Sequence, residues 1–428
     1  MIPHNTENTK PLVSEINAKG VLGEFDYRIP FYDNNEGRMQ VIYAENGRGK
    51  TSLLKAINCI MSANIDLLQE LTEIPFLQIE VKYDNGTIIR ASRKDDVLGE
   101  LSIIIETAGE KVQELIAETG SFRAKLTLKG FRSYQDTLFE YSPGSFFLGA
   151  DRLTNLPRET VRKVTNLPFG LPRGSRRDQL ETLSSLMGKI ESRFNQIAAL
   201  SGQESNNTYL AITNSILNGT VMDTDEAPEL LRNKLTERID TIINKGELYE
   251  RYGLISLQQV RGISKAILEN KSNNPTELRY LYTVINPYLD SIDVQLNTLN
   301  PALRLIDKYV NNVNTFFDLI ELMYSPSKGI SLHKRKRPSD KIEIDNLSSG
   351  EKHLLILLSE TVLLTSSKPL IIIDEPEISL GIRWQREILP ALLECSESSN
   401  LQFLVASHSV QILNSVGRDK ILRASEAE

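Results

Sequence analysis

Residues 44–53 read AENGRGKTSL, where two glycines flank a basic residue and a lysine and a threonine follow. The apolar run MQVIY at 39–43 predicts a strand before this stretch, and SLLKAI at 52–57 predicts a helix after it. A glycine-rich loop between a strand and a helix directs backbone N–H groups and the positive end of the helix at an anion. The stretch therefore predicts a phosphate-binding loop.

The residue types in this loop suit a nucleoside triphosphate. Ala44 takes the first glycine position of the pattern GxxxxGK[ST]. We expect Lys50 to bridge the β- and γ-phosphates and the Thr51 hydroxyl to ligate magnesium. ATP and Mg²⁺ are thus the expected ligands. The residues predicted to bind ATP are Asn46, Gly47, Arg48, Gly49, Lys50, Thr51 and Ser52.

A second motif lies far downstream, where residues 370–377 read LIIIDEPE. Four apolar residues predict a buried parallel strand, and two carboxylates follow at its carboxyl end, where open α/β sheets bind ligands. We expect Asp374 to hold magnesium, directly or through water, and Glu375 to polarise the attacking water. An acidic turn after a strand is common, but together with the phosphate-binding loop it predicts nucleotide hydrolysis.

Two further motifs flank this strand. LSSGE at 347–351 precedes the apolar helix KHLLILLSETVLL, which Ser348 or Ser349 can cap, as an ordinary helix cap would. FLVASHS at 403–409 predicts a strand that ends at His408. The order of the four motifs resembles the ABC class of ATPases, whose signature is usually written LSGGQ.

That resemblance implies a head-to-tail dimer clamped around ATP. The signature of one copy would cover the γ-phosphate held by Lys50 of the other, and His408 would contact the same phosphate. With Glu375, His408 is the second predicted catalytic residue. The residues predicted to act in trans are Leu347, Ser348, Ser349, Gly350 and Glu351.

The separation of Lys50 from Leu347 is much longer than in transporter subunits. The wording LSSGEKH and DEPEISL resembles the branch that contains RecF, Rad50 and the overcoming-lysogenization-defect proteins, over residues 20–155 and 328–425. The predicted fold is α/β, an ABC-type ATPase head with a β-rich first lobe and a compact helical insertion. The predicted domains are the two halves of the head, 1–154 and 328–428, and the insertion, 155–327.

Local patterns predict further elements. FLQIEVKY and TIIRASRK flank Asp84-Asn85-Gly86, a strong hairpin signal. Helical stripes run through 155–327, and Pro287 and Pro301 are expected to interrupt the last of them. Residues 329–344 predict two strands around Pro338.

The strand in FFLGADRLTNLP ends near Asp151 and Arg152. The resemblance assigns these two residues a role in coupling the nucleotide to the insertion. A surface ion pair is the alternative. Phe25 and Tyr27 precede the loop at a distance that suits stacking on adenine, although core packing is the more common role for such residues.

The composition of the chain limits the kinds of partner that it is expected to bind. The formal charge of −7 excludes a generally basic surface, so any DNA contact depends on local runs such as His333–Arg337. The two cysteines, Cys59 and Cys395, form no disulfide framework or metal-ligand spacing. No apolar run has the length of a signal peptide or a membrane span. A cytoplasmic location without membrane contact is expected.

The sequence predicts no nuclease centre, because little follows His408 and the histidines are dispersed. It resembles most the stand-alone ATPase subunits of two-gene antiphage systems, of the AriA type in PARIS and the PtuA type in Septu. That resemblance implies a homo-oligomeric sensor and scaffold, a dimer or a larger ring, which restrains a TOPRIM or HNH effector nuclease until a phage-derived trigger appears. Gly381 departs from many relatives, which have histidine there. The alternatives are a RecF-like repair ATPase that binds DNA and a nucleotide-gated structural module with little turnover.

Overall fold

The chain forms two compact units in the computed structural model, one of Met1–Leu183 with Leu347–Glu428 and one of Ser184–Asn346. The first unit, the head, holds all four motifs. The second, the middle unit, is mostly helical. The structure describes residues 11–31, 38–43, 45, 47–62, 64–117, 128–150, 176–202, 228–269, 275–365, 370–397, 399, 401–423 and 425–426.

The head contains a five-stranded sheet in the order β14-β3-β13-β12-β8, in which every pairing is parallel. Strands β12 and β13 are buried along their whole length, as expected for a parallel sheet covered on both faces. The strands are β3 (Met39–Tyr43), β8 (Ser145–Leu148), β12 (Leu370–Asp374), β13 (Gln402–Ser407) and β14 (Ile421–Arg423).

An antiparallel sheet in the order β15-β2-β1-β4-β5-β6-β7 forms the β-rich lobe of the head. The predicted hairpin joins β4 to β5, and Gly86 takes the positive φ (80°) that its turn requires. The strands are β1 (Val13–Val21), β2 (Phe25–Pro30), β4 (Gln78–Tyr83), β5 (Ile88–Arg93), β6 (Leu101–Thr107), β7 (Glu110–Ala117) and β15 (Ser425–Glu426).

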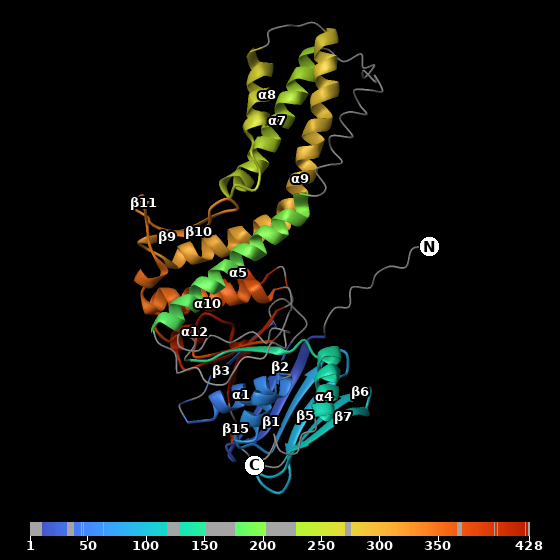
Figure 1. Cartoon of the computed structure of the whole chain (residues 1–428), viewed down its shortest axis with the longest axis vertical. Coiled ribbons are helices and arrows are strands. Elements are labelled where there is room, and N and C mark those ends of the chain that lie inside the picture. The colour runs from blue at the N-terminus through green and yellow to red at the C-terminus, as the bar shows by residue number, and fades with distance from the viewer. Residues whose placement is uncertain are drawn as a thin grey trace. The chain divides into compact units, whose positions relative to one another are not determined.

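Helix α1 (Lys50–Met61) lies between the two sheets and joins them into one core (Figure 1). Its apolar residues share a buried cluster with Ile79 of β4 and with Ile372 of β12. The α/β class and the β-rich lobe are therefore confirmed. The other helices of the head are α2 (Ile65–Leu71), α4 (Leu128–Tyr141), α10 (Ser349–Leu364), α11 (Ile382–Cys395), α12 (Val410–Leu413) and the 3₁₀ turn η3 (Arg418–Lys420).

In the middle unit, α7 and α9 run parallel, because ion pairs join Arg238 to Asp290 and Lys245 to Asp293, in the same order along both helices. Helix α5 begins in the head and continues into this unit. The elements are α5 (Arg176–Gly202), α7 (Pro228–Arg251), α8 (Gln258–Glu269), α9 (Pro275–Phe316), β9 (Ile320–Ser325), β10 (Gly329–Lys334), β11 (Arg337–Lys341) and η2 (Ile344–Asn346).

Two local expectations in this unit differ from the structure: its long helix is not interrupted at the prolines, and the two strands predicted in residues 329–344 form but do not turn at Pro338. Helix α9 continues through Pro287 and Pro301, although each ring removes one backbone hydrogen bond, and Figure 1 shows the helix changing direction along its length. Pro338 lies within β11, at the edge of the three-stranded sheet, where a strand tolerates proline. The turn between β10 and β11 instead falls at Arg335 and Lys336.

Residues 328–346 belong to the middle unit, whereas the predicted insertion ended at 327. Two contacts explain the difference. Asn314 of α9 exchanges hydrogen bonds with both backbone groups of Leu322 in β9, at 2.9 and 2.7 Å. Arg335 donates to the carbonyl oxygens of Asn314 and Phe317 at the end of α9, at 3.0 and 2.9 Å. The small sheet is thus attached to the long helix.

Candidate functional site

Three of the four motifs meet at one edge of the parallel sheet. Strand β13 lies between β3 and β12, with Tyr43 of β3 beside Ser407 and Asp374 of β12 beside Ala406. Because the strands are parallel, their carboxyl ends share this edge. The phosphate-binding loop, the acidic turn after Asp374 and the turn at His408 are therefore neighbours.

The backbone of the loop suits an anion. Gly47 and Gly49 have φ values of 87° and 75°, which favour glycine. A Cβ on Gly49 would lie 3.0 Å from Val21, so this position is also sterically restricted. Gly49 caps α1 without a side-chain hydrogen bond, so that the first amides of the helix face the loop. This arrangement can hold a phosphate.

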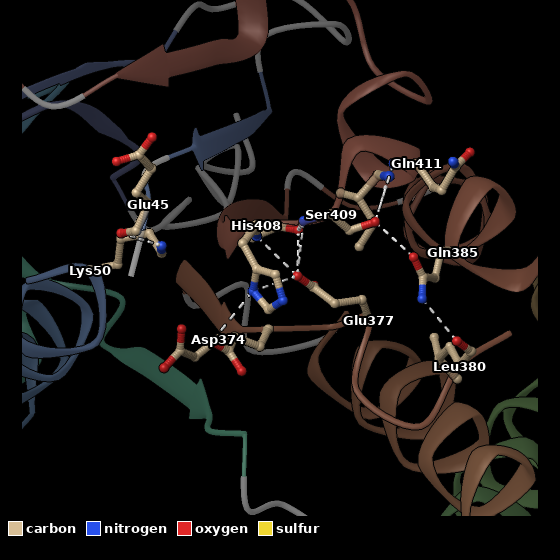
Figure 2. Close-up of polar contacts among 12 residues, drawn as sticks. Glu45, Lys50, Asp374, Glu377, Leu380, Gln385, His408, Ser409 and Gln411 are labelled. Atoms are coloured by element: carbon tan, nitrogen blue, oxygen red, sulfur yellow. Dashed lines mark hydrogen bonds and ion pairs between the residues drawn. The ribbon is translucent and has the colours of Figure 1, made fainter. Parts of the chain in front are cut away.

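Lys50 opens helix α1 and is 6% exposed. Its Nζ atom donates to the carbonyl oxygen of Glu45 at 3.2 Å (Figure 2). Burial lowers the pKa of Lys50 from its ordinary value, while the carboxylates of Glu375, Asp374 and Glu377 act in the opposite direction. The Nζ ammonium at the start of α1 is thus placed where a phosphate on the loop amides would meet a positive charge.

Thr51 and Asp374 are 323 residues apart in sequence, yet the Thr51 hydroxyl donates to Asp374 Oδ2 at 2.7 Å. Asp374 is 2% exposed. A hydroxyl beside a carboxylate is an oxygen donor set that suits Mg²⁺, which usually completes its shell with water and substrate phosphates. No group of three metal-ligating side chains occurs among the described residues, so the pair fits nucleotide-bound magnesium better than a protein-only cage.

Glu375 follows with an unusual backbone. Its φ of 48° lies in the left-handed region, which is costly for a residue with a Cβ. Its backbone N–H donates to the carbonyl oxygen of Ala406 at 2.9 Å, which fixes the turn against β13. Its Oε1 atom lies 3.6 Å from His408 Nδ1. The two predicted catalytic residues are therefore neighbours.

A cavity of about 320 Å³ opens at the loop, large enough for a triphosphate. Sequence reasoning missed Leu22, a wall residue that lies before the loop in the turn after β1. Tyr27 donates its hydroxyl to the carbonyl oxygen of Arg48 and is 4% exposed, so it supports the loop from the core. The residues that line the cavity are Leu22, Glu45, Gly47, Arg48, Gly49, Lys50, Thr51, Ser52 and Glu375.

The signature residues form the start of α10. Ser348 and Glu351 make a reciprocal capping box, with Ser348 N and Oγ both 2.7 Å from Glu351 Oε2. Gly350 is buried, and a Cβ there would lie 2.6 Å from the Ser379 carbonyl oxygen. Leu347 is also buried, whereas Ser348 and Ser349 are exposed. The structure thus gives Gly350 a packing role within its own subunit.

The structure shows one carboxylate that the sequence interpretation left without a role. Glu377, in the same DEPE turn, is buried and contacts the turn at His408. In the sequence, the only sign of this role was that Glu377 follows Asp374 and Glu375 closely. Four residues singled out from the sequence, Ala44, Asn46, Asp151 and Arg152, lie outside the described residues.

Comparison with protein families matches residues 264–414 to a model described as "AAA domain, putative AbiEii toxin, Type IV TA system". The matched stretch contains the signature, the DEPE turn and His408. Comparison with curated proteins finds no match. The chain is thus similar to this ATPase-domain family over residues 264–414, and its glycine loop and Thr51–Asp374 contact form a site that suits a nucleotide with magnesium.

Solved structures with similarity to this chain include three SMC heads. The Smc head domain with an extended coiled coil, bound to the C-terminal domain of ScpA, from Pyrococcus furiosus is 15% identical, covers 97% of this chain and 96% of its own, and has a TM-score of 0.42. The Smc head domain with a coiled coil and joint from Pyrococcus yayanosii is 14% identical, covers 97% of each chain and has a TM-score of 0.39. The SMC head domain from Thermotoga maritima is 14% identical, covers 97% and 99%, and has a TM-score of 0.39.

Among the described helices, none is long and apolar enough to cross a membrane.

Proposed function

We propose that this chain hydrolyses ATP at the edge of its parallel sheet. The observation that carries the proposal is the 2.7 Å hydrogen bond between Thr51 and Asp374, which joins two motifs from opposite ends of the chain. Lys50, the loop amides and this pair would bind the triphosphate and its magnesium. The bound metal would neutralise phosphate charge.

Glu375 is the proposed general base. It lines the cavity of the loop, and the left-handed backbone conformation at this residue fixes the position of its Cβ and so of its side chain. From this position the carboxylate can take a proton from a water molecule that attacks the γ-phosphate. His408, beside Glu375, is proposed to contact the same phosphate.

The test is phosphate release and nucleotide binding by three proteins. The wild type should bind and hydrolyse ATP. Lys50→Ala should lose binding, and Glu375→Gln should retain binding while its turnover falls by about 10²-fold or more. Normal hydrolysis by Glu375→Gln would show that another group is the base. A wild type that binds nucleotide with little turnover would favour the structural-module alternative.

We further propose that two heads pair head to tail around ATP. Ser348 and Ser349 are exposed at the start of α10, where backbone amides at the helix end can face an anion on a second copy. Glu375→Gln should therefore dimerise, or form larger rings, in the presence of ATP. Light scattering coupled to size exclusion measures this, and Lys50→Ala is the matched control that should remain monomeric.

The biological role that we propose is a sensor and scaffold in bacterial antiphage defence, which restrains a separate TOPRIM or HNH nuclease until a phage component appears. The family match, whose description names a toxin system, supports it. The motifs LSSGEKH and DEPEISL, which resemble those of AriA-type and PtuA-type subunits, are its second support. Copurification of the wild type with the product of the neighbouring gene tests it. Antiphage activity by this chain alone would contradict it.

DNA binding of the RecF type has weaker support. In the basic run His333–Arg337, Arg335 is engaged by carbonyl oxygens at the end of α9, and Lys334 lies 3.9 Å from Asp340. Lys336 and Arg337 remain exposed. Salt-sensitive DNA binding that requires ATP, and that Lys336→Glu weakens, would favour this alternative.

A further inference from the structure

The acidic turn after β12 carries a third carboxylate, Glu377, which is 6% exposed. Its Oε1 atom accepts hydrogen bonds from Ser407 Oγ at 2.8 Å, from the backbone N–H of His408 at 3.0 Å and from that of Ser409 at 3.2 Å. Figure 2 shows the carboxylate pointing at this turn. Three consecutive residues therefore converge on one oxygen atom.

The same oxygen atom also contacts the His408 ring. Nδ1 of His408 lies 3.3 Å from Glu377 Oε1 and 3.6 Å from Glu375 Oε1. A proton on Nδ1 would suit both contacts, because a carboxylate oxygen accepts hydrogen bonds. The backbone hydrogen bond from His408 thus fixes the position of its Cα and Cβ, and the ring contact fixes the orientation of the imidazole.

A neutral amide could make most of these contacts. The three hydrogen bonds from residues 407–409 need only one acceptor oxygen. A buried carboxylate is costlier than a buried amide unless its charge is used. Within the described part of the chain, Oε2 of Glu377 has no hydrogen-bond partner. The contact with the imidazole, at ion-pair distance, is the one that a neutral amide would not reproduce.

The turn also has a second attachment. Ser409 Oγ donates to Gln385 Oε1 at 2.7 Å, and Gln385 Nε2 donates to the Leu380 carbonyl oxygen at 2.9 Å (Figure 2). Ser409 caps α12 as well. These bonds hold the far side of the turn independently of Glu377, so a substitution at Glu377 should leave the protein folded.

We propose that Glu377 is a positioning residue of the ATPase site, which uses its buried negative charge to hold the His408 imidazole beside Glu375. This inference rests on the proposed ATPase function. Glu377 acts through His408 and takes no proton from the attacking water.

Kinetics test the proposal first. Glu377→Gln keeps an acceptor oxygen for the turn and removes the charge. The value of kcat should fall by about tenfold, as it does when residues that orient metal-binding side chains are changed, and KM for ATP should stay nearly the same. In a His408→Ala background the same substitution should change kcat no further. A normal kcat in Glu377→Gln, or an equal loss in both backgrounds, would overturn the proposal.

The matched control is Glu80→Gln. Glu80 is also a largely buried carboxylate, 9% exposed, and pairs with Arg90 at 2.8 Å and Lys82 at 3.3 Å in the antiparallel lobe. This variant should lose stability while kcat stays normal. A fall in kcat equal to that of Glu377→Gln would show that loss of a buried charge acts through general destabilisation, against the proposal.

A second readout needs no nucleotide. Histidine-selective ¹⁵N labelling gives signals from four residues, and the His408→Ala spectrum identifies the ring signals of His408. Glu377→Gln should shift these ring nitrogen signals, and unchanged signals would overturn the proposal. If the wild type does not hydrolyse ATP, the proposed function fails, yet this spectrum still decides whether Glu377 holds the imidazole.

Discussion

The backbone of Glu375 predicts that removal of its side chain stabilises the protein. A φ of 48° costs a residue with a Cβ about 1–2 kcal/mol relative to its preferred regions. Glycine adopts this region freely but loses about 0.5–1 kcal/mol more chain entropy on folding. Glu375→Gly should therefore raise the free energy of unfolding by about 0.5–1 kcal/mol, or Tm by about 1–4 °C, while ATP turnover is lost.

Calorimetry and urea unfolding of matched variants separate the backbone from the charge. Glu375→Gln removes the same charge near Asp374 and Glu377 but keeps the Cβ, so it lacks the backbone gain. Asp95→Gly, at an exposed turn with a φ of 68°, should give a smaller gain with normal turnover, because aspartate tolerates this region better. A glycine variant no more stable than the glutamine variant would refute the reasoning.

Three further predictions concern the head. Gln402→Ala removes both side-chain hydrogen bonds to the backbone of Val13, at 2.8 and 2.7 Å, and should lower the free energy of unfolding by about 2–4 kcal/mol in urea titrations. Hydrogen bonds from Lys82 and, to a lesser extent, from Arg28 lower the pKa of Glu15 from 4.5 to about 2. The stability that the Glu15 carboxylate contributes is therefore present above pH 4.5 and is lost as the pH falls towards 2. Glu15→Gln should therefore flatten the dependence of Tm on pH in that window. Gly49→Ala should reduce ATP affinity, measured by calorimetric titration, because of its φ of 75° and the Cβ contact with Val21.

Local sequence predicted the elements around the site well. Strand β3, helix α1, strand β12 and the β4–β5 hairpin all form where their short-range patterns indicate. In each case the signal lies within the element or in its flanking turn residues. Glycines with positive φ at Gly47, Gly49 and Gly86 belong to the same class of local information.

Predictions failed where neighbours in space changed the local preference. Packing against α7 and the small sheet keeps α9 helical through Pro287 and Pro301. An edge position allows Pro338 to lie in a strand. Glu377 has no local signal for its role, because its partners at 407–409 come from a different strand.

The sequence by itself identified the candidate nucleotide-binding groups of this chain, since the glycine loop, the lysine and hydroxyl after it, and the acidic strand end are each set by a few adjacent residues. Only the tertiary structure decided which of these groups touch. The parallel order β3-β13-β12 brings Thr51 to Asp374, and His408 to Glu375 and Glu377. Strand pairing over such separations depends on burial shared by the whole core, which no short stretch of sequence contains.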